Sequence, residues 1–229
     1  MEFTKLSNRL DLVASFVPAG ARLLDVGSDH AYLPIALLQE GKIEAAIAGE
    51  VVEGPYQSAL QNVADNGLED KIEVRLANGL AAFEPSDGIS CITIAGMGGR
   101  LIADILAAGL EKLASVSRLV LQPNNREDEL RSWLVDHNFR IVDEAILEEN
   151  EKFYEILVVE QDSQELSAKE LRFGPYLMRE QAPAFVQKWS KEVEKLAFAL
   201  EQVPVENQSA RASLEERIAQ IKEVLHVSK

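Results

Sequence analysis

The chain has little that would support redox, disulfide or metal chemistry. Its 229 residues include one cysteine, Cys91, and three histidines that lie far apart, His30, His137 and His226. A single cysteine excludes an internal disulfide, and a thiol inside the apolar run ISCITIA is typical of a buried structural residue. Zinc sites need Cys or His at short ligand spacing, so we expect no bound metal.

Long apolar runs and an excess of positive charge are also missing. The opening stretch MEFTKLSNRLDLV has no long apolar run and no small-residue cleavage site, so we expect a cytoplasmic protein without a membrane partner. The net charge of −15 opposes binding to nucleic acid, which favours a positive surface.

The acidity is unevenly distributed. Residues 1–160 hold 27 Asp and Glu against 13 Lys and Arg, whereas residues 161–229 hold 11 against 10. In the second part, helical spacing aligns two sets of basic residues: Lys169, Arg172 and Arg179, then Lys188, Lys191 and Lys195. Each set predicts either a local basic stripe or an ordinary solvated helix face.

What the chain does have, up to about residue 160, is short apolar runs that alternate with helical patterns. The runs are residues 21–27, 45–50, 71–77, 89–96, 117–123, 139–149 and 153–160. The first five are separated by segments long enough for crossover helices, which predicts a parallel sheet covered on both faces. Pro34 and Pro55 are expected to open two of these helices, and Gly67 to end the second. The last two runs are joined by little more than Asn-Glu, which predicts an antiparallel hairpin.

The expected fold is therefore α/β and Rossmann-like, with a mostly parallel seven-stranded sheet. Beyond about residue 162 the strand patterns stop and apolar residues recur at helical spacing, from Phe185 to Leu200 and from Leu214 to Leu225. The short break VPVENQ predicts that these two helices fold back as an antiparallel, coiled-coil-like hairpin. We expect two domains, residues 1–162 with the sheet and residues 163–229 with the hairpin.

The stretch LLDVGSDHAYLP, residues 23–34, carries the first candidate site. Asp25 and Gly27 end an apolar strand as in a dinucleotide site, but Ser28, Asp29 and His30 stand where further glycines would accommodate a pyrophosphate. Asp29 would repel a pyrophosphate. S-adenosylmethionine, which has no phosphate and carries an ammonium and a sulfonium, fits this pattern better.

Other strand ends extend this site, because ligands of open parallel sheets bind there. Glu50, about 20 residues past the glycine turn, is placed to accept hydrogen bonds from two ribose hydroxyls. Asn78 and Gly79 predict either an amide facing an adenine or an ordinary turn. The glycine-rich ITIAGMGGR (residues 92–100) exposes backbone to a flat ring or opens a helix, and QPNN (residues 122–125) offers amides to a heterocycle.

In their order and spacing, LLDVGSDHAYLP, AGEVVEGP, ANGL and IAGMGG resemble a family of bacterial tRNA methyltransferases that use S-adenosylmethionine to modify N1 of adenine 22. The resemblance covers roughly residues 5–160, and the family also carries a C-terminal helical hairpin. It implies a class I methyltransferase fold, tRNA as partner and S-adenosylhomocysteine as product. Many relatives have Asp at the position of Asn78, whose side-chain oxygen still accepts from an adenine amino group.

The motifs and the resemblance together assign three sets of site residues. We expect the cofactor to be bound by Asp25, Gly27, Glu50, Val51, Asn78, Gly79, Ala95 and Gly96. The predicted catalytic residues are Asp29, His30, Met97 and Asn124, and the predicted tRNA contacts are Arg9, Lys188, Lys191 and Lys195.

Two of the predicted catalytic residues have alternative roles. N1 of adenine presents an in-plane lone pair, so attack needs in-line placement and tolerance of the resulting cation. Asp29 either offsets that charge while accepting from the adenine amino group, or holds the amino-acid end of the cofactor. His30 either contacts the base or packs as a structural residue.

Other functions remain open at this stage. The chain could methylate another RNA or a small heterocycle. A nicotinamide-dependent oxidoreductase is disfavoured by the missing glycines, and a non-catalytic binding module by Glu50 together with AGMGG. A monomer is favoured over an oligomer.

Overall fold

The apolar runs of the first 160 residues form one seven-stranded sheet in the computed structural model, which describes residues 4–226. The strands are β1 (Ala21–Val26), β2 (Ile43–Glu50), β3 (Ile72–Leu76), β4 (Cys91–Met97), β5 (Arg118–Pro123), β6 (Phe139–Glu149) and β7 (Lys152–Gln161). They lie in the order β3-β2-β1-β4-β5-β7-β6, and only the pairings of β7 with β5 and β6 are antiparallel. The predicted α/β fold with a mostly parallel sheet is confirmed.

The predicted hairpin joins β6 to β7 through a two-residue turn. Asn150 and Glu151 both have positive φ, 52° and 63°, which is the backbone conformation that suits tight antiparallel hairpins. β7 returns between β5 and β6, a position that the sequence pattern does not reveal. This insertion brings the start of β7 toward the carboxyl ends of the parallel strands.

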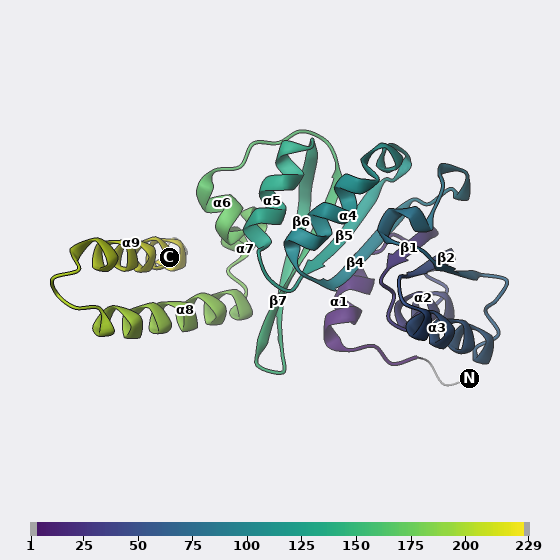
Figure 1. Cartoon of the computed structure of the whole chain (residues 1–229), viewed down its shortest axis with the longest axis horizontal. Coiled ribbons are helices and arrows are strands. Elements are labelled where there is room, and N and C mark those ends of the chain that lie inside the picture. Colours follow the sequence, from purple (N-terminus) through teal and green to yellow (C-terminus); the bar gives the residue numbers. More distant parts are fainter. Residues whose placement is uncertain (1–3, 227–229) are drawn as a thin grey trace.

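Two layers of helices cover the two faces of the sheet (Figure 1). The helices on one face are α1 (Asn8–Phe16), α2 (Tyr32–Gln39) and α3 (Glu53–Asp65), and those on the other are α4 (Gly99–Ala108) and α5 (Glu127–Asp136). Short 3-10 turns lie at η1 (Gly79–Ala82), η2 (Pro85–Asp87) and η3 (Leu110–Ser115). Neighbouring strand residues point to opposite layers: Leu23 packs with the first and Leu24 with the second, as the period of two requires.

The predicted helix ends need one small correction. Pro34 and Pro55 do not open their helices, because α2 begins at Tyr32 and α3 at Glu53. Both prolines lie within the first turn, where no intrahelical partner is needed for the missing N–H. Gly67 has the expected role: α3 ends at Asp65, and Gly67, at φ 63°, donates its N–H to the Ala64 carbonyl.

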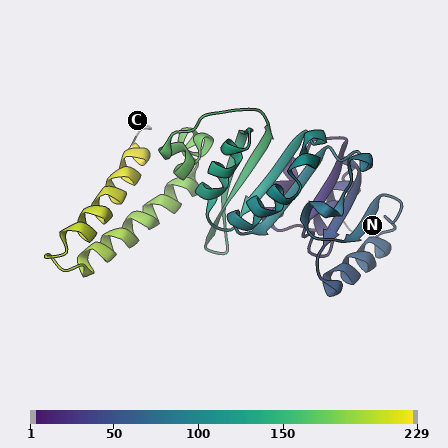
Figure 2. The same cartoon turned by 45° about the horizontal axis from the view of Figure 1, so that its top comes forward.

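The C-terminal region contains the predicted helical hairpin and two shorter helices. They are α6 (Ala168–Phe173), α7 (Pro175–Glu180), α8 (Pro183–Gln202) and α9 (Gln208–His226). α8 and α9 pack side by side in antiparallel orientation and project from the edge of the sheet (Figure 2). Lys169, Arg172 and Arg179 do not form a stripe on one continuous helix, because Gly174, at φ 83°, separates α6 from α7, and this leaves the alternative of ordinary helix faces.

The helical region is fastened to the sheet by an apolar cluster. Phe185 and Trp189 of α8 pack with Ile146 of β6, and Ile221 of α9 belongs to the same cluster. The chain leaves β7 at Gln161, close to the expected domain boundary at residue 162. The division of the chain into two domains stays a prediction.

A buried ionic cluster lies under the same contact. Arg131 of α5 is fully buried and forms ion pairs with Glu144 of β6 at 2.7 Å and Glu155 of β7 at 2.5 Å. Lys188 of α8 reaches Glu155 at 2.7 Å and Glu127 at 2.9 Å. Burial alone would lower the pKa of Arg131, but Glu155 and Glu144 hold it above its ordinary value. The cluster therefore ties α5, the β6–β7 hairpin and α8 together.

Candidate active site

The loop after β1 adopts an unusual backbone. Gly27 has φ 65°, and the next residues with positive φ are Asp29 (46°), His30 (73°) and Ala31 (62°), three non-glycine residues in succession. Such conformations cost free energy and persist where the surrounding structure enforces them, as at ligand-binding loops. The positive φ of Gly27 disfavours any other residue there, and an added Cβ would also require the Met97 terminal methyl to shift.

Asp25 anchors this loop from the end of β1. Its carboxylate is 4% exposed and accepts from the Ser28 and Thr93 hydroxyls, each at 2.6 Å. Burial raises the pKa of Asp25, while the two hydroxyl hydrogen bonds offset part of that effect. The carboxylate is thus fixed at the base of the site, with lone pairs still available for a cationic ligand.

Glu50, at the end of β2, is the least satisfied buried acid of the site. It is 5% exposed, and among residues 4–226 its Oε1 has no hydrogen-bond partner. Burial raises the pKa of Glu50, and the backbone amides of Asp29 and His30 oppose this increase. An unpaired buried acceptor is costly, so this oxygen is poised for a ligand that supplies hydroxyl donors.

The glycine-rich end of β4 is held by side chains from β5 and from the loop that follows it. Gln122 is fully buried, and its Oε1 accepts from Gly96 N at 3.0 Å and from Arg9 Nη1 at 2.6 Å. Asn124 donates from Nδ2 to the Gly96 carbonyl at 2.7 Å and accepts from Gln122 Nε2 at 3.1 Å. Since Gly96 has φ 79°, these bonds fix an otherwise permissive turn.

These elements enclose a cavity of about 350 Å³. Its walls include eight of the predicted site residues: Arg9, Asp25, Gly27, Asp29, Ala95, Gly96, Met97 and Asn124. The other predicted cofactor residues follow the neighbouring strands: Glu50, Val51, Asn78 and Gly79. The Ala77 N–H donates to the Glu50 carbonyl at 2.7 Å, so the ends of β2 and β3 stay in register along this edge.

The structure places His30 beside the cavity rather than in its wall. Its Nε2 lies 3.3 Å from Asp29 Oδ1, and its backbone carbonyl accepts from Asn62. The Asp29 side chain is 85% exposed, so its charge faces solvent and the cavity mouth. A direct contact between His30 and a substrate base stays a prediction.

A second, larger hollow of about 700 Å³ lies between the β6–β7 hairpin and α8. All three predicted lysines line it, but they differ in their partners. Lys188 is held by Glu127 and Glu155, whereas Lys191 makes one longer contact, 3.3 Å, with Glu148. Lys195 is exposed and has no ion pair within residues 4–226. The geometry therefore favours Lys191 and Lys195 as tRNA contacts over Lys188.

Some site residues were not found from the sequence. Thr93 lies inside an apolar strand and Tyr154 inside the final hairpin, so neither follows a strand end. Tyr154 lines both cavities, which only the insertion of β7 beside β5 makes apparent.

Cys91 is fully buried, and burial raises the pKa of its thiol to about 12. It therefore stays protonated at neutral pH, as expected of a structural cysteine. Within residues 4–226 no cluster of three His, Cys, Asp or Glu side chains is arranged to hold a metal ion. No helix in that range combines the length and apolarity needed to cross a membrane.

Comparison with known proteins agrees with this geometry. The family described as TrmK, tRNA (adenine(22)-N(1))-methyltransferase, matches residues 23–223. The chain belongs to this family. The tRNA (adenine(22)-N(1))-methyltransferase of Bacillus subtilis strain 168 is 41% identical over 237 residues, which cover 98% of this chain and 99% of that protein.

Solved structures of family members share the complete fold. A putative tRNA (m1A22) methyltransferase from Streptococcus pneumoniae has a TM-score of 0.96 at 67% identity, with 97% of this chain and 100% of that chain covered. The same protein in complex with S-adenosyl-L-methionine gives 0.90 at 66% identity with the same coverage. TrmK from M. capricolum, in complex with S-adenosyl-homocysteine, gives 0.85 at 29% identity, covering 98% of this chain and 99% of that chain.

Proposed function

We propose that this protein transfers the methyl group of S-adenosylmethionine to N1 of adenine 22 in tRNA, in the cytoplasm. The observation that carries the proposal is the buried Glu50 carboxylate, whose Oε1 has no hydrogen-bond partner within the described residues, beside the strained Gly27–Ala31 loop, in a chain that matches the methyltransferase family over residues 23–223. This edge of the sheet is where open parallel sheets bind nucleotides.

The residues present fit S-adenosylmethionine. The Glu50 carboxylate would accept from the two ribose hydroxyls, which satisfies the lone Oε1. Asp25 and the Ala95 backbone, both in the cavity wall, would hold the amino-acid end. Val51 and Asn78 are exposed next to Glu50 and would contact the adenine. The exposed Asp29 would repel the pyrophosphate of a nicotinamide cofactor, which disfavours an oxidoreductase.

The chain's part in the reaction is mainly placement and electrostatics. The bound cofactor supplies an electrophilic methyl group. N1 attacks with an in-plane lone pair, so no side chain has to remove a proton before the attack. Asp29 lies at the cavity mouth, where its carboxylate offsets the positive charge that develops on the ring. Met97 and Asn124 also line the cavity, and Asn124 is held there by hydrogen bonds with Gln122 and Gly96.

The tRNA must present an unstacked adenine, at a cost of a few kcal/mol. The hollow beside α8 supplies cations for the phosphates around it, with Lys191 and Lys195 on its helical side. Phosphate contacts of this kind position an RNA without reading its sequence.

The test is to incubate the purified protein with S-adenosylmethionine and an unmodified tRNA transcript, and then to identify the methylated nucleoside by mass spectrometry. We expect 1-methyladenosine at position 22, and none in a transcript that carries guanosine there. Methylation of free adenosine alone, or of another position, would overturn the proposal. Sedimentation of the protein with and without tRNA tests the proposed monomer.

A further inference from the structure

The two cavities of the site share part of their walls. Asn124 and Tyr154 line both the 350 Å³ cavity beside Gly96 and the 700 Å³ hollow beside α8. Asn124 comes from the loop after β5, and Tyr154 is near the start of β7. A nucleotide that enters from the larger hollow must pass between or over these side chains to reach the Met97 loop.

Tyr154 is linked to the β4 end by a chain of contacts through Arg9 of α1 and Gln122 of β5. The Arg9 guanidinium lies over its ring, with Cζ 5.5 Å from the centroid. Arg9 is fixed by Gln122 at 2.6 Å, and Gln122 also accepts from Gly96 N at 3.0 Å. The ring is therefore positioned relative to the Gly96 turn, and it is half-buried and lines both cavities.

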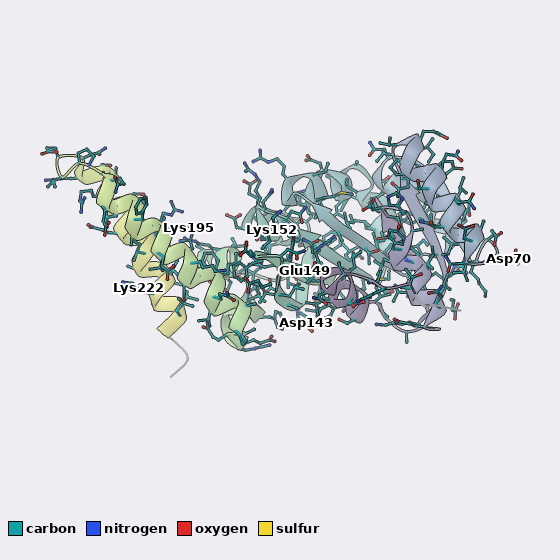
Figure 3. The ribbon with its side chains drawn as sticks, turned by 90° about the horizontal axis from the view of Figure 1, so that it is seen from below. Asp70, Asp143, Glu149, Lys152, Lys195 and Lys222 are labelled. Atoms are coloured by element: carbon teal, nitrogen blue, oxygen red, sulfur yellow. The ribbon has the colours of Figure 1, made fainter. Side chains whose placement is uncertain are left out.

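The larger hollow has the charge that an RNA strand requires. Its cationic side chains come from the hairpin turn and the C-terminal helices: Lys152, Arg172, Lys188, Lys191, Lys195 and Arg217. Figure 3 shows Lys152 near the β6–β7 turn and Lys195 on the helical hairpin, on the same side of the molecule. Four acidic residues also line the hollow: Glu127 and Glu192 are paired with Lys188 and Arg217, whereas Asp128 and Glu151 form no ion pair within the described residues. The six cationic side chains therefore leave the lining with a net positive charge. Phosphates can follow the exposed cations while a base turns toward Tyr154.

We propose that Tyr154 is the platform on which the extruded target adenine stacks before methyl transfer. The inference rests on the proposed function and adds a substrate-positioning residue that comes from β7, outside the strand-end motifs. An aromatic face suits this role because base–aromatic stacking stabilises an unstacked base without depending on its hydrogen-bonding edge. The edge with N1 then stays free for Asp29 and the methyl group.

The experiment compares Tyr154→Leu with Tyr154→Phe in the full-length protein. Single-turnover methylation is measured at saturating tRNA and S-adenosylmethionine, and both affinities are measured separately. Tyr154→Leu should slow the single turnover about tenfold or more, the loss expected from removing one base–aromatic stack. Tyr154→Phe should stay within about threefold of the wild type, because it keeps the ring. Both variants should bind tRNA and cofactor nearly as the wild type does, since phosphate contacts dominate tRNA affinity.

Tyr176→Leu is the matched control. Tyr176 is also half-buried and also lies under a guanidinium, with Arg179 Cζ 4.7 Å from its centroid, but it lines neither cavity. Its variant should methylate at the wild-type rate. The proposal is overturned if Tyr154→Leu keeps the wild-type rate, if Tyr154→Phe is as slow as Tyr154→Leu, or if Tyr176→Leu is equally slow. If the wild-type protein makes no 1-methyladenosine, the proposed function itself fails and the platform with it.

Discussion

Burial of the Glu50 carboxylate without a partner for Oε1 costs free energy that a bound ribose can recover. Glu50→Gln keeps the shape but removes the charge. We expect it to weaken S-adenosylmethionine by about 1–3 kcal/mol, the usual cost of losing a charged hydrogen-bond partner, as measured by calorimetry. Without cofactor it should melt about 2–4 °C higher at neutral pH, which corresponds to ~1 kcal/mol for a chain of this size.

The pH dependence of that stability difference follows from the raised pKa of Glu50. Because the folded pKa lies above the unfolded one, the wild type is most favoured below the unfolded pKa and loses stability as pH rises through the folded value. The advantage of Glu50→Gln should therefore shrink on acidification. Glu44→Gln, an exposed position on the same strand, should change neither affinity nor melting. Unchanged cofactor affinity in Glu50→Gln would remove Glu50 from the ribose site.

Asp29 combines a strained backbone, at φ 46°, with a side chain that is 85% exposed. If it offsets the ring cation, Asp29→Ala should retain most of the cofactor affinity and lower the single-turnover rate roughly a hundredfold, as loss of one preorganised group does. Loss of cofactor affinity with a normal rate at saturation would instead assign Asp29 to the amino-acid end of the cofactor. Calorimetry and single-turnover methylation on this one variant separate the two roles.

At the scale of elements, the sequence predicts what depends on local pattern. The periodicity and spacing of apolar residues predict the parallel strands, the Asn150-Glu151 turn and the α8–α9 hairpin. The residues at the ends of the predicted strands include most of those that line the 350 Å³ cavity. The position of β7 between β5 and β6 depends on tertiary pairing, so Tyr154 was missed. From the sequence, Glu144 and Glu155 are expected to face solvent from their strands. They are buried because both form ion pairs with Arg131 of α5, which the sequence pattern does not reveal.

That buried cluster makes a testable contribution to stability. Burial alone would raise the pKa of Glu155, but Arg131 and Lys188 hold it below its ordinary value, so its carboxylate stays charged. Arg131→Met would leave buried carboxylates without their main partner, and should cost about 3–5 kcal/mol in the free energy of unfolding, as measured by urea denaturation.

The control for this substitution is Arg140→Met. Arg140 pairs with Asp162 at 3.3 Å, but the two side chains are 50% and 56% exposed. Exposed pairs of this kind contribute about 0–1 kcal/mol, so the control should unfold almost as the wild type does. Equal effects of the two substitutions would contradict the role assigned to the buried cluster.

The same cluster explains why residue 174 is glycine, since a Cβ there would lie 2.7 Å from Arg131 Nη2 and from Glu144 Oε2.

The whole molecule has a net charge of −15, which opposes an RNA substrate, but six cationic side chains line one hollow. Lys191 and Lys195 line the hollow next to the 350 Å³ cavity, on helix α8, which projects from the edge of the sheet (Figure 2). Lys188 shares that hollow, yet its ammonium is bound by two carboxylates and helps to hold α8 against the sheet. The helical hairpin is thereby anchored to the sheet, and we propose that its Lys191 and Lys195 contact the tRNA.

This arrangement predicts which lysines control the salt dependence of tRNA binding. Lys195→Ala should lower the slope of log affinity against log salt by about 0.7–0.9, the change expected when one phosphate contact is lost. Lys222→Ala is matched in charge and exposure, but Lys222, on α9, is not among the residues that line the hollow and should leave the slope unchanged. Figure 3 labels both lysines on the helical hairpin. Both slopes come from titrations of fluorescent tRNA at several salt concentrations in the presence of S-adenosylhomocysteine. Equal slopes for the two variants would mean that tRNA does not follow the hollow, because a general effect of net charge cannot distinguish one exposed lysine from another.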